Sequence, residues 1–301
     1  LDSDHNLAIG VNAMGGTWAN SKSEFNIAIG NNSLDGALDN AYYNIALGQY
    51  GLGSLTTGDS NIAIGWAALE STTTGSSNLA IGQQAMQVHT TGGNNIAIGT
   101  AAMDDTNAGS NSLGSAENIF IGKDSGGGTW ADTASQYNVA IGNGTMDSPL
   151  DGANSNVALG YYALSGITTA DNNVAIGHNA GILTTTGSGG VYIGYRAGYS
   201  NTQYSNVYIG SEAGYLLGDS AYGNTAVGTE AMKTSGTANN NNPLNSTAVG
   251  SEAMRGITTG DYNTGIGQRA GFYNATGSRN TYVGTASGQG ASGSSQSDNV
   301  G

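Results

Sequence analysis

The sequence predicts an all-β protein that folds as a parallel β-solenoid, and three observations carry this prediction. A five-residue segment, NIAIG or a close variant, recurs along the chain with a predominantly 17-residue period. Its fifth residue is always Gly, and the segments between copies are rich in Gly, Ser, Thr and Asn. One such unit cannot bury its own apolar face, whereas stacked units build a continuous core.

The repeats divide residues 1–301 into a single repeat domain when the Asn of NxAIG is taken as position one. Each 16- to 23-residue repeat is expected to form one rung of the solenoid, and a partial rung opens at Asn299. At about 4.8 Å per rung, the stack is expected to be on the order of 75 Å long. The 16 rungs start at residues 6, 26, 44, 61, 78, 95, 118, 138, 156, 173, 190, 206, 224, 246, 263 and 280.

Positions two to four predict a short strand in each rung. In the rung that starts at Asn61, the apolar residues Ile62 and Ile64 flank Ala63, and Gly65 ends the segment; such an alternation is typical of a strand. Because positions two and four point to the same face, we predict that Ile62 and Ile64 form the core and that Ala63 faces away. Position three is Ala in 11 of 16 rungs, which indicates a close surface: either neighbouring chains around a fibre axis or the opposite wall of the same roll.

The other constant positions predict a corner and an amide ladder. Gly65 stands at position five, where a corner excludes a side chain. Asn61 stands in a column that is Asn in 14 of 16 rungs, and we expect stacked, hydrogen-bonded side-chain amides there. Position eight is always small, and position nine is Met, Leu or Gly. Position two becomes Thr in the last four rungs, which predicts a narrower or wetter core in them.

A longer, 112-residue period overlies the short one. This shift places the segment GGTWA, which begins at Gly15, on the segment that begins at Gly127, and it pairs Trp18 with Trp130. The insert lengths recur with the same shift, which indicates duplication of a six-rung block. We therefore expect the two Trp side chains to clamp equivalent loops.

Composition and charge argue against several classes of function. Charged residues make up 9% of the chain, and the net charge is −14. Binding to nucleic acid needs a basic stripe, which seven scattered Lys and Arg residues do not supply. No apolar run reaches the roughly 18 residues that a membrane-spanning helix needs, so membrane insertion is not expected. A chain without Cys forms no disulfides.

The repeat resembles sequences of two known kinds. The NxAIG strand with its constant Gly, followed three positions later by a small residue, is similar to the head repeats of YadA-type trimeric autotransporter adhesins and to the NIAIG-type repeats of phage tail-fibre proteins. The resemblance covers essentially the whole chain from Asn6, although the head repeats are typically shorter than the 17-residue units. It implies a left-handed β-roll, usually trimeric, in a surface-exposed fibre.

No residue is expected to be catalytic or to bind a metal, and no cofactor is expected. His5, His89 and His178 lack metal-ligand spacing, and we expect His89 and His178 to be solvated. Calcium in the turns stays open, although the GGxGxD pattern is absent. The best candidates for acid–base catalysis are turn residues that we expect to be solvated: Asp35, Asp39, Asp104, Asp105, Asp147 and Asp151.

Aromatic residues are the candidates for contact with a ligand or a neighbouring chain. Stacked tyrosines can form a flat platform for sugar rings or for another protein. Alternatively, they fill the space between chains where Ala is too small. The candidates are Tyr192, Tyr208, Tyr195, Tyr199, Trp18 and Trp130.

The expected function is that of a structural, adhesive fibre segment, located outside the cell, on a cell surface or on a virion, that attaches multivalently. The expected partners are further copies of the chain, in a homotrimer or an end-to-end filament, together with surface glycans or a host receptor. A β-solenoid polysaccharide lyase or hydrolase is one alternative, against which the dispersed cations argue. An ice-binding solenoid is another, although the Thr pairs lie in loops of unequal length.

Overall fold

The computed structural model describes residues 4–18, 21–106, 114–200, 202–234, 241–290 and 297–298. These residues form 16 three-residue strands, one in each predicted rung, and no α-helix. The chain divides into two compact units with eight strands each: unit 1, Leu1–Ser155, and unit 2, Asn156–Gly301. The prediction of an all-β parallel solenoid is confirmed, whereas the partial rung at Asn299 lies outside the described residues.

The eight strands of unit 1 pair in chain order and are all parallel. Equivalent positions stand side by side, so that Ile62 lies between Ile45 and Leu79. The strands are β1 (Leu7–Ile9), β2 (Ile27–Ile29), β3 (Ile45–Leu47), β4 (Ile62–Ile64), β5 (Leu79–Ile81), β6 (Ile96–Ile98), β7 (Ile119–Ile121) and β8 (Val139–Ile141).

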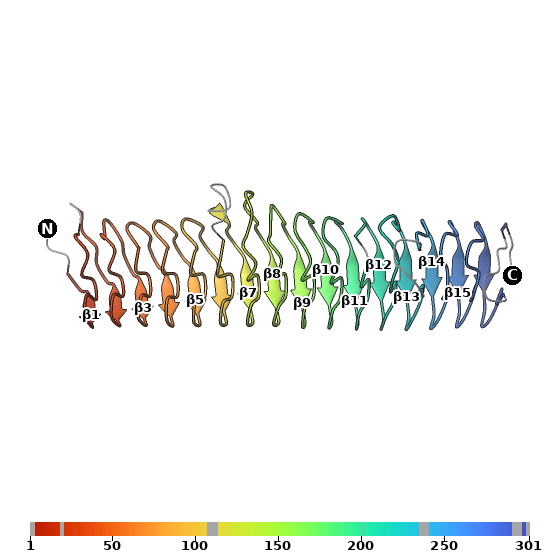
Figure 1. The fold of residues 1–301 in the computed structure, drawn as a ribbon, viewed down its shortest axis with the longest axis horizontal. Coiled ribbons are helices and arrows are strands. Elements are labelled where there is room, and N and C mark those ends of the chain that lie inside the picture. Colours follow the sequence, from red (N-terminus) through yellow and green to blue (C-terminus); the bar gives the residue numbers. More distant parts are fainter. Residues whose placement is uncertain are drawn as a thin grey trace. The chain divides into compact units, whose positions relative to one another are not determined.

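Unit 2 has the same construction, with eight parallel strands in chain order. Figure 1 shows that within each unit the strands stack along one side and the loops project on the other. No helix among the described residues is long and apolar enough to span a membrane. The strands are β9 (Val157–Leu159), β10 (Val174–Ile176), β11 (Val191–Ile193), β12 (Val207–Ile209), β13 (Thr225–Val227), β14 (Thr247–Val249), β15 (Thr264–Ile266) and β16 (Thr281–Val283).

The corner Gly has the role that the sequence predicts. Gly65 has a φ of +134°, and a Cβ there would lie 2.4 Å from the carbonyl oxygen of Gly82 on the next rung. Both the backbone conformation and the distance to the next rung exclude a side chain. The same geometry recurs at position five of the other rungs, except that a Cβ at Gly284 in the last rung would have no neighbour within 4 Å.

The Asn ladder is also confirmed. The side-chain Nδ2 of Asn61 donates to Asn44 Oδ1 at 3.0 Å and to Gly75 O at 2.8 Å, and its backbone N–H donates to Asn44 Oδ1 at 3.0 Å. Asn61 is fully buried, so these bonds satisfy polar groups that would otherwise destabilise the interior.

The core lies on the other side of the strand from the one that we predicted. Ala63 is fully buried, whereas Ile62 and Ile64 are only half-buried. The alternation was right and the assignment of faces was wrong. The interior is so narrow that the strand contributes only a small side chain, while Leu69 at position nine, with a φ of 52°, supplies the buried aliphatic group.

The reversal of the strand faces also changes the interpretation of the Thr residues at position two. Thr225, Thr247, Thr264 and Thr281 stand in place of Ile or Val on the outward face of β13–β16, where all four are half-buried. The prediction of a narrower or wetter core in these rungs, based on this column, is therefore wrong. What changes in them is the polarity of the outer face.

Large side chains at position three are accommodated by Gly at position nine. Phe120, Tyr192, Tyr208 and Tyr282 replace the buried Ala, and position nine of the same rung is then Gly126, Gly198, Gly214 or Gly288. A Cβ at Gly214 would lie 2.6 Å from the ring of Tyr208. Two further rungs have small residues at both positions, Ala175 with Gly181 and Gly265 with Gly271. A Cβ at Gly181 or Gly271 would lie 2.7 or 2.8 Å from a Tyr ring of the next rung, so this densely packed interior balances volume between neighbouring rungs as well.

Candidate interaction surfaces

The residues at positions two and four form an outward-facing aliphatic stripe in each unit. In unit 1, all 16 of these side chains are Ile, Leu or Val. None is buried, and Leu7, Ile9, Ile29 and Ile141 are exposed. In unit 2, the stripe comprises the same positions of β9–β16, with Thr at position two of the last four strands. The parallel register aligns these side chains in two continuous columns.

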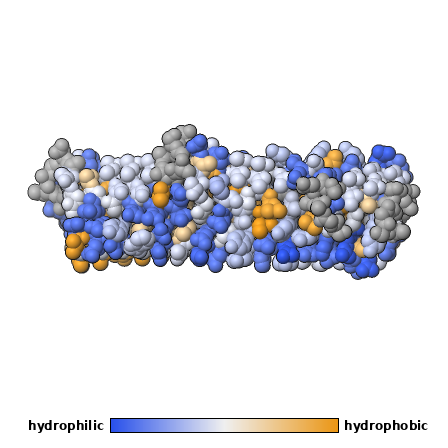
Figure 2. All heavy atoms as spheres, viewed as in Figure 1, coloured by the Kyte–Doolittle hydropathy of each residue, from blue (hydrophilic) through white to orange (hydrophobic). Residues whose placement is uncertain are grey.

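The stripe is a continuous surface along each unit. Eight rungs at about 4.8 Å, with two columns about 7 Å apart, give roughly 270 Å² in each unit. In Figure 2, hydrophobic residues line the lower edge of the N-terminal rungs, where Figure 1 places the strands. Contiguous exposed apolar patches of a few hundred Å² are often functional.

Three of the six predicted contact residues are interior residues instead. Tyr192, Tyr208 and Trp130 are fully buried. The rings of Tyr192 and Tyr208 pack 5.9 Å apart, and Trp130 packs edge-on against Phe120 at 5.6 Å. They therefore form neither a ligand platform nor an interchain contact, because Tyr192 and Tyr208 stand at position three, which points into the solenoid, and Trp130 is enclosed beside Phe120. Burial raises the pKa of Tyr192 to about 12.

The two Trp residues do occupy equivalent loops. Trp130 Nε1 donates to Gly126 O at 2.9 Å, and Trp18 Nε1 donates to Met14 O at 3.3 Å, four residues earlier in both cases. Both bonds close a loop onto its own rung. Trp18 is half-buried, whereas Trp130 is an internal residue.

Tyr195 and Tyr199 lie on the surface, where they contact other aromatic and charged side chains. The Arg196 guanidinium lies over both rings, 5.0 Å from the Tyr195 centroid and 5.6 Å from that of Tyr199. Tyr199 also packs against Tyr215 at 5.2 Å. The structure thus separates the six candidates into interior and surface groups.

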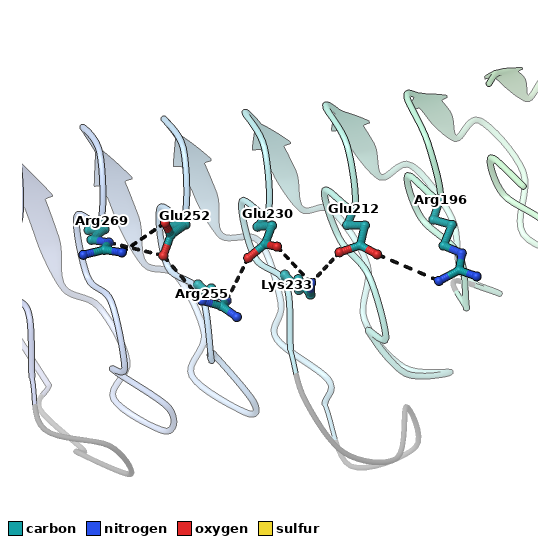
Figure 3. Close-up of polar contacts among 7 residues, drawn as sticks. All are labelled: Arg196, Glu212, Glu230, Lys233, Glu252, Arg255 and Arg269. Atoms are coloured by element: carbon teal, nitrogen blue, oxygen red, sulfur yellow. Dashed lines mark hydrogen bonds and ion pairs between the residues drawn. The ribbon is translucent and has the colours of Figure 1, made fainter. Parts of the chain in front are cut away.

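Unit 2 carries a row of paired charged residues that we did not predict from the sequence. We call it the ion-pair ladder, and Figure 3 shows its seven residues, which alternate in sign along neighbouring rungs. We had taken the cations to be scattered, but they stand in register at positions seven and ten of successive rungs. The ladder consists of Arg196, Glu212, Glu230, Lys233, Glu252, Arg255 and Arg269.

Two polar residues of unit 1 are less exposed than we expected. His89 is fully buried, and its Nδ1 lies 2.9 Å from Thr106 Oγ1; burial lowers its pKa to about 4. Asp104 is half-buried, and burial together with the neighbouring Asp105 raises its pKa to about 6. His178 is exposed, as predicted.

No group of three or more His, Asp or Glu within the described residues is placed to hold a metal ion. The prediction that the chain carries no catalytic residue and no cofactor stays a prediction.

Comparison with known proteins finds no matching family model, no matching curated protein and no matching solved structure. The resemblance of the repeats to adhesin heads and tail fibres therefore stays a prediction.

Proposed function

We propose that the chain is a structural segment of an extracellular fibre, on a cell surface or a virion, and that copies of it pack side by side through the aliphatic stripe. The single observation that supports this proposal is the outward direction of positions two and four. A solenoid that needed only its own core could place Thr there in every rung, as this chain does at position two of β13–β16.

The repeat itself favours a second copy of the chain as the occupant of the stripe. The stripe has a constant spacing of about 4.8 Å along its columns, and a partner that fills it over many rungs must share that period. It also contains no charged residue in either unit, as is usual at the centre of an interface. Roughly 270 Å² per unit gives about 540 Å² when both units contribute, which is about two thirds of the ~800 Å² per partner of a standard-size interface, so residues beside the stripe would supply the rest.

The assembly that we propose is a trimer around the stripe, in line with the repeat resemblance, or a higher-order fibre. Loops and surface aromatic residues then stay on the outside, where many weak contacts with glycans or a receptor add up through avidity.

Sedimentation velocity of the intact chain tests this proposal. We expect a mass of at least two chains of 30.1 kDa. Ile45→Lys with Leu79→Lys should shift the equilibrium toward the monomer by about tenfold or more, because an interface would bury unpaired charges.

Val88→Lys with Leu183→Lys is the matched control, since it adds the same charge at apolar surface positions outside the strands. A monomeric wild type, or equal effects of the two double variants, would contradict the proposal.

A further inference from the structure

The cations of the chain gather at one place, although the chain is strongly acidic. It has seven Lys and Arg residues against 21 Asp and Glu, and four of the seven belong to the ion-pair ladder. Elsewhere in the described part of the chain, Lys22, Lys123 and Arg279 each pair with one acid at separate places.

A pocket of about 190 Å³ opens beside the ladder. Among the described residues, two cations line it and no carboxylate does; the described lining residues are Lys233, Thr234, Arg255, Gly256 and Tyr273. Three consecutive rungs build it, held in register by backbone hydrogen bonds. The Gly256 N–H donates to Lys233 O at 2.9 Å, and the Tyr273 N–H donates to Arg255 O at 3.0 Å.

Ion pairs within the ladder hold Lys233 and Arg255 in place before a ligand binds. Lys233 Nζ bonds to Glu212 and lies 3.0 Å from Glu230, while Arg255 lies 3.1 Å from Glu230 and 3.4 Å from Glu252 (Figure 3). Surface pairs of this kind contribute only about 0–1 kcal/mol each, so a ligand can compete for the cations. The ladder holds four cations and three carboxylates, which leaves one positive charge uncompensated.

Gly256 and Tyr273 form part of the pocket lining beside the two cations. Gly256 has a φ of +87°, and a Cβ there would lie 3.5 Å from Tyr273 Cδ1. The absence of that side chain leaves room in front of the ring, which is 39% exposed. An aromatic ring presents an apolar surface on which the C–H groups of a sugar can lie.

We propose that this pocket binds a single carboxylated sugar unit, with the carboxylate on Lys233 and Arg255 and the C–H face on Tyr273. Arg and Lys form charge-assisted hydrogen bonds with carboxylates. The net charge of −14 repels polyanions, which favours a ligand with one isolated charge. This inference deepens the proposed attachment function and rests on it for the ligand class, but sugar binding is measurable apart from self-assembly.

Calorimetric titration of the intact protein tests the proposal, with methyl glucuronide, methyl glucoside and sodium sulfate as probes. We expect the glucuronide to bind about tenfold or more tightly than the glucoside, because the two differ in the carboxylate. Arg255→Gln should weaken glucuronide binding by a similar factor. Arg279→Gln should leave it unchanged, since Arg279 pairs with Asp298 and belongs neither to the ladder nor to the pocket lining.

Three results would overturn the inference: equal affinity for glucuronide and glucoside, sulfate binding as tight as glucuronide binding, or equal losses in Arg255→Gln and Arg279→Gln. Circular dichroism of each variant shows that it is folded. Sedimentation of the same samples reports assembly separately, so a failure of sugar binding is distinguishable from a failure of the fibre proposal.

Discussion

At the scale of single residues, each rung depends on a backbone that repeatedly enters the region of positive φ. At position five, φ is +134° at Gly65, a conformation that in practice only Gly adopts. At positions seven and nine, Ala67 and Leu69 have φ values of 55° and 52°. This left-handed region costs a residue with a side chain roughly 1–2 kcal/mol, so Gly is obligatory only at the corner, and the other two positions are free to carry useful side chains.

His89 illustrates how one buried residue couples the fold to pH. It occupies the position held by Thr72 and Thr106 in the adjacent rungs, and its Nε2 lies 3.0 Å from Gly92 O. Its pKa falls from 6.5 to about 4 in the folded chain because burial disfavours the charged ring. Between these values the unfolded chain binds a proton that the folded chain does not, so stability is lost as the pH falls.

We predict that His89→Thr removes this part of the pH dependence. In the wild type, His89 should lower the free energy of unfolding by up to ~3 kcal/mol between pH 6.5 and pH 4, and the variant should lack that loss. Urea unfolding of both proteins at pH 7 and pH 4.5 measures the difference. An identical pH dependence in the two proteins would show that the ring is not buried and neutral.

At the scale of the rung, the strand and the turn that faces it compensate for each other in volume. Tyr208 faces Gly214 in its rung, whereas Ala63 faces Leu69 in its own. Gly190, which stands where most rungs have the ladder Asn, fits the same rule, because a Cβ there would lie 2.3 Å from the Tyr192 hydroxyl. The core is therefore specified by pairs of positions and not by one column.

A double-mutant cycle at Tyr208 and Gly214 tests this compensation. Gly214→Leu should destabilise the chain by about 3 kcal/mol or more, because Leu would overlap the Tyr208 ring. Adding Tyr208→Ala should restore part of that stability, since Ala and Leu is the pair found at Ala63 and Leu69. Urea unfolding of the four proteins gives the coupling free energy, and additive losses would contradict the compensation.

At the scale of the whole molecule, the sequence was sufficient for the rung register, the corner Gly65 and the Asn61 ladder. The period alone dictates these features, and all are observed. It was not sufficient for the direction of the strand faces, because an alternation of Ile62, Ala63 and Ile64 is compatible with either face pointing inward. The pairing of Tyr208 with Gly214 carried the missing information, since only residues that share an interior need to compensate in volume.

The reversed faces also move the predicted interface. For Ala63 we had left open a contact with a neighbouring chain or with the opposite wall of the same roll, and its burial within its own chain supports the second. Ile62 and Ile64 point outward, so the proposed contact between chains lies on them. The unit 1 stripe to which they belong is entirely aliphatic. Our central claim, which is a proposal, is that copies of the chain pack against one another through this surface.

Site-directed cross-linking is the most direct test of this claim, and a chain without Cys provides a clean background. Single Cys variants Ile62→Cys, Ala63→Cys and Val88→Cys would be treated with a flexible bis-maleimide, and covalent dimers would be quantified on denaturing gels. We expect the yield of covalent dimer from Ile62→Cys to be well above the yields from the other two variants. Dimers from Ala63→Cys in place of Ile62→Cys, or a yield from Ile62→Cys no higher than that from Val88→Cys, would contradict the proposed packing.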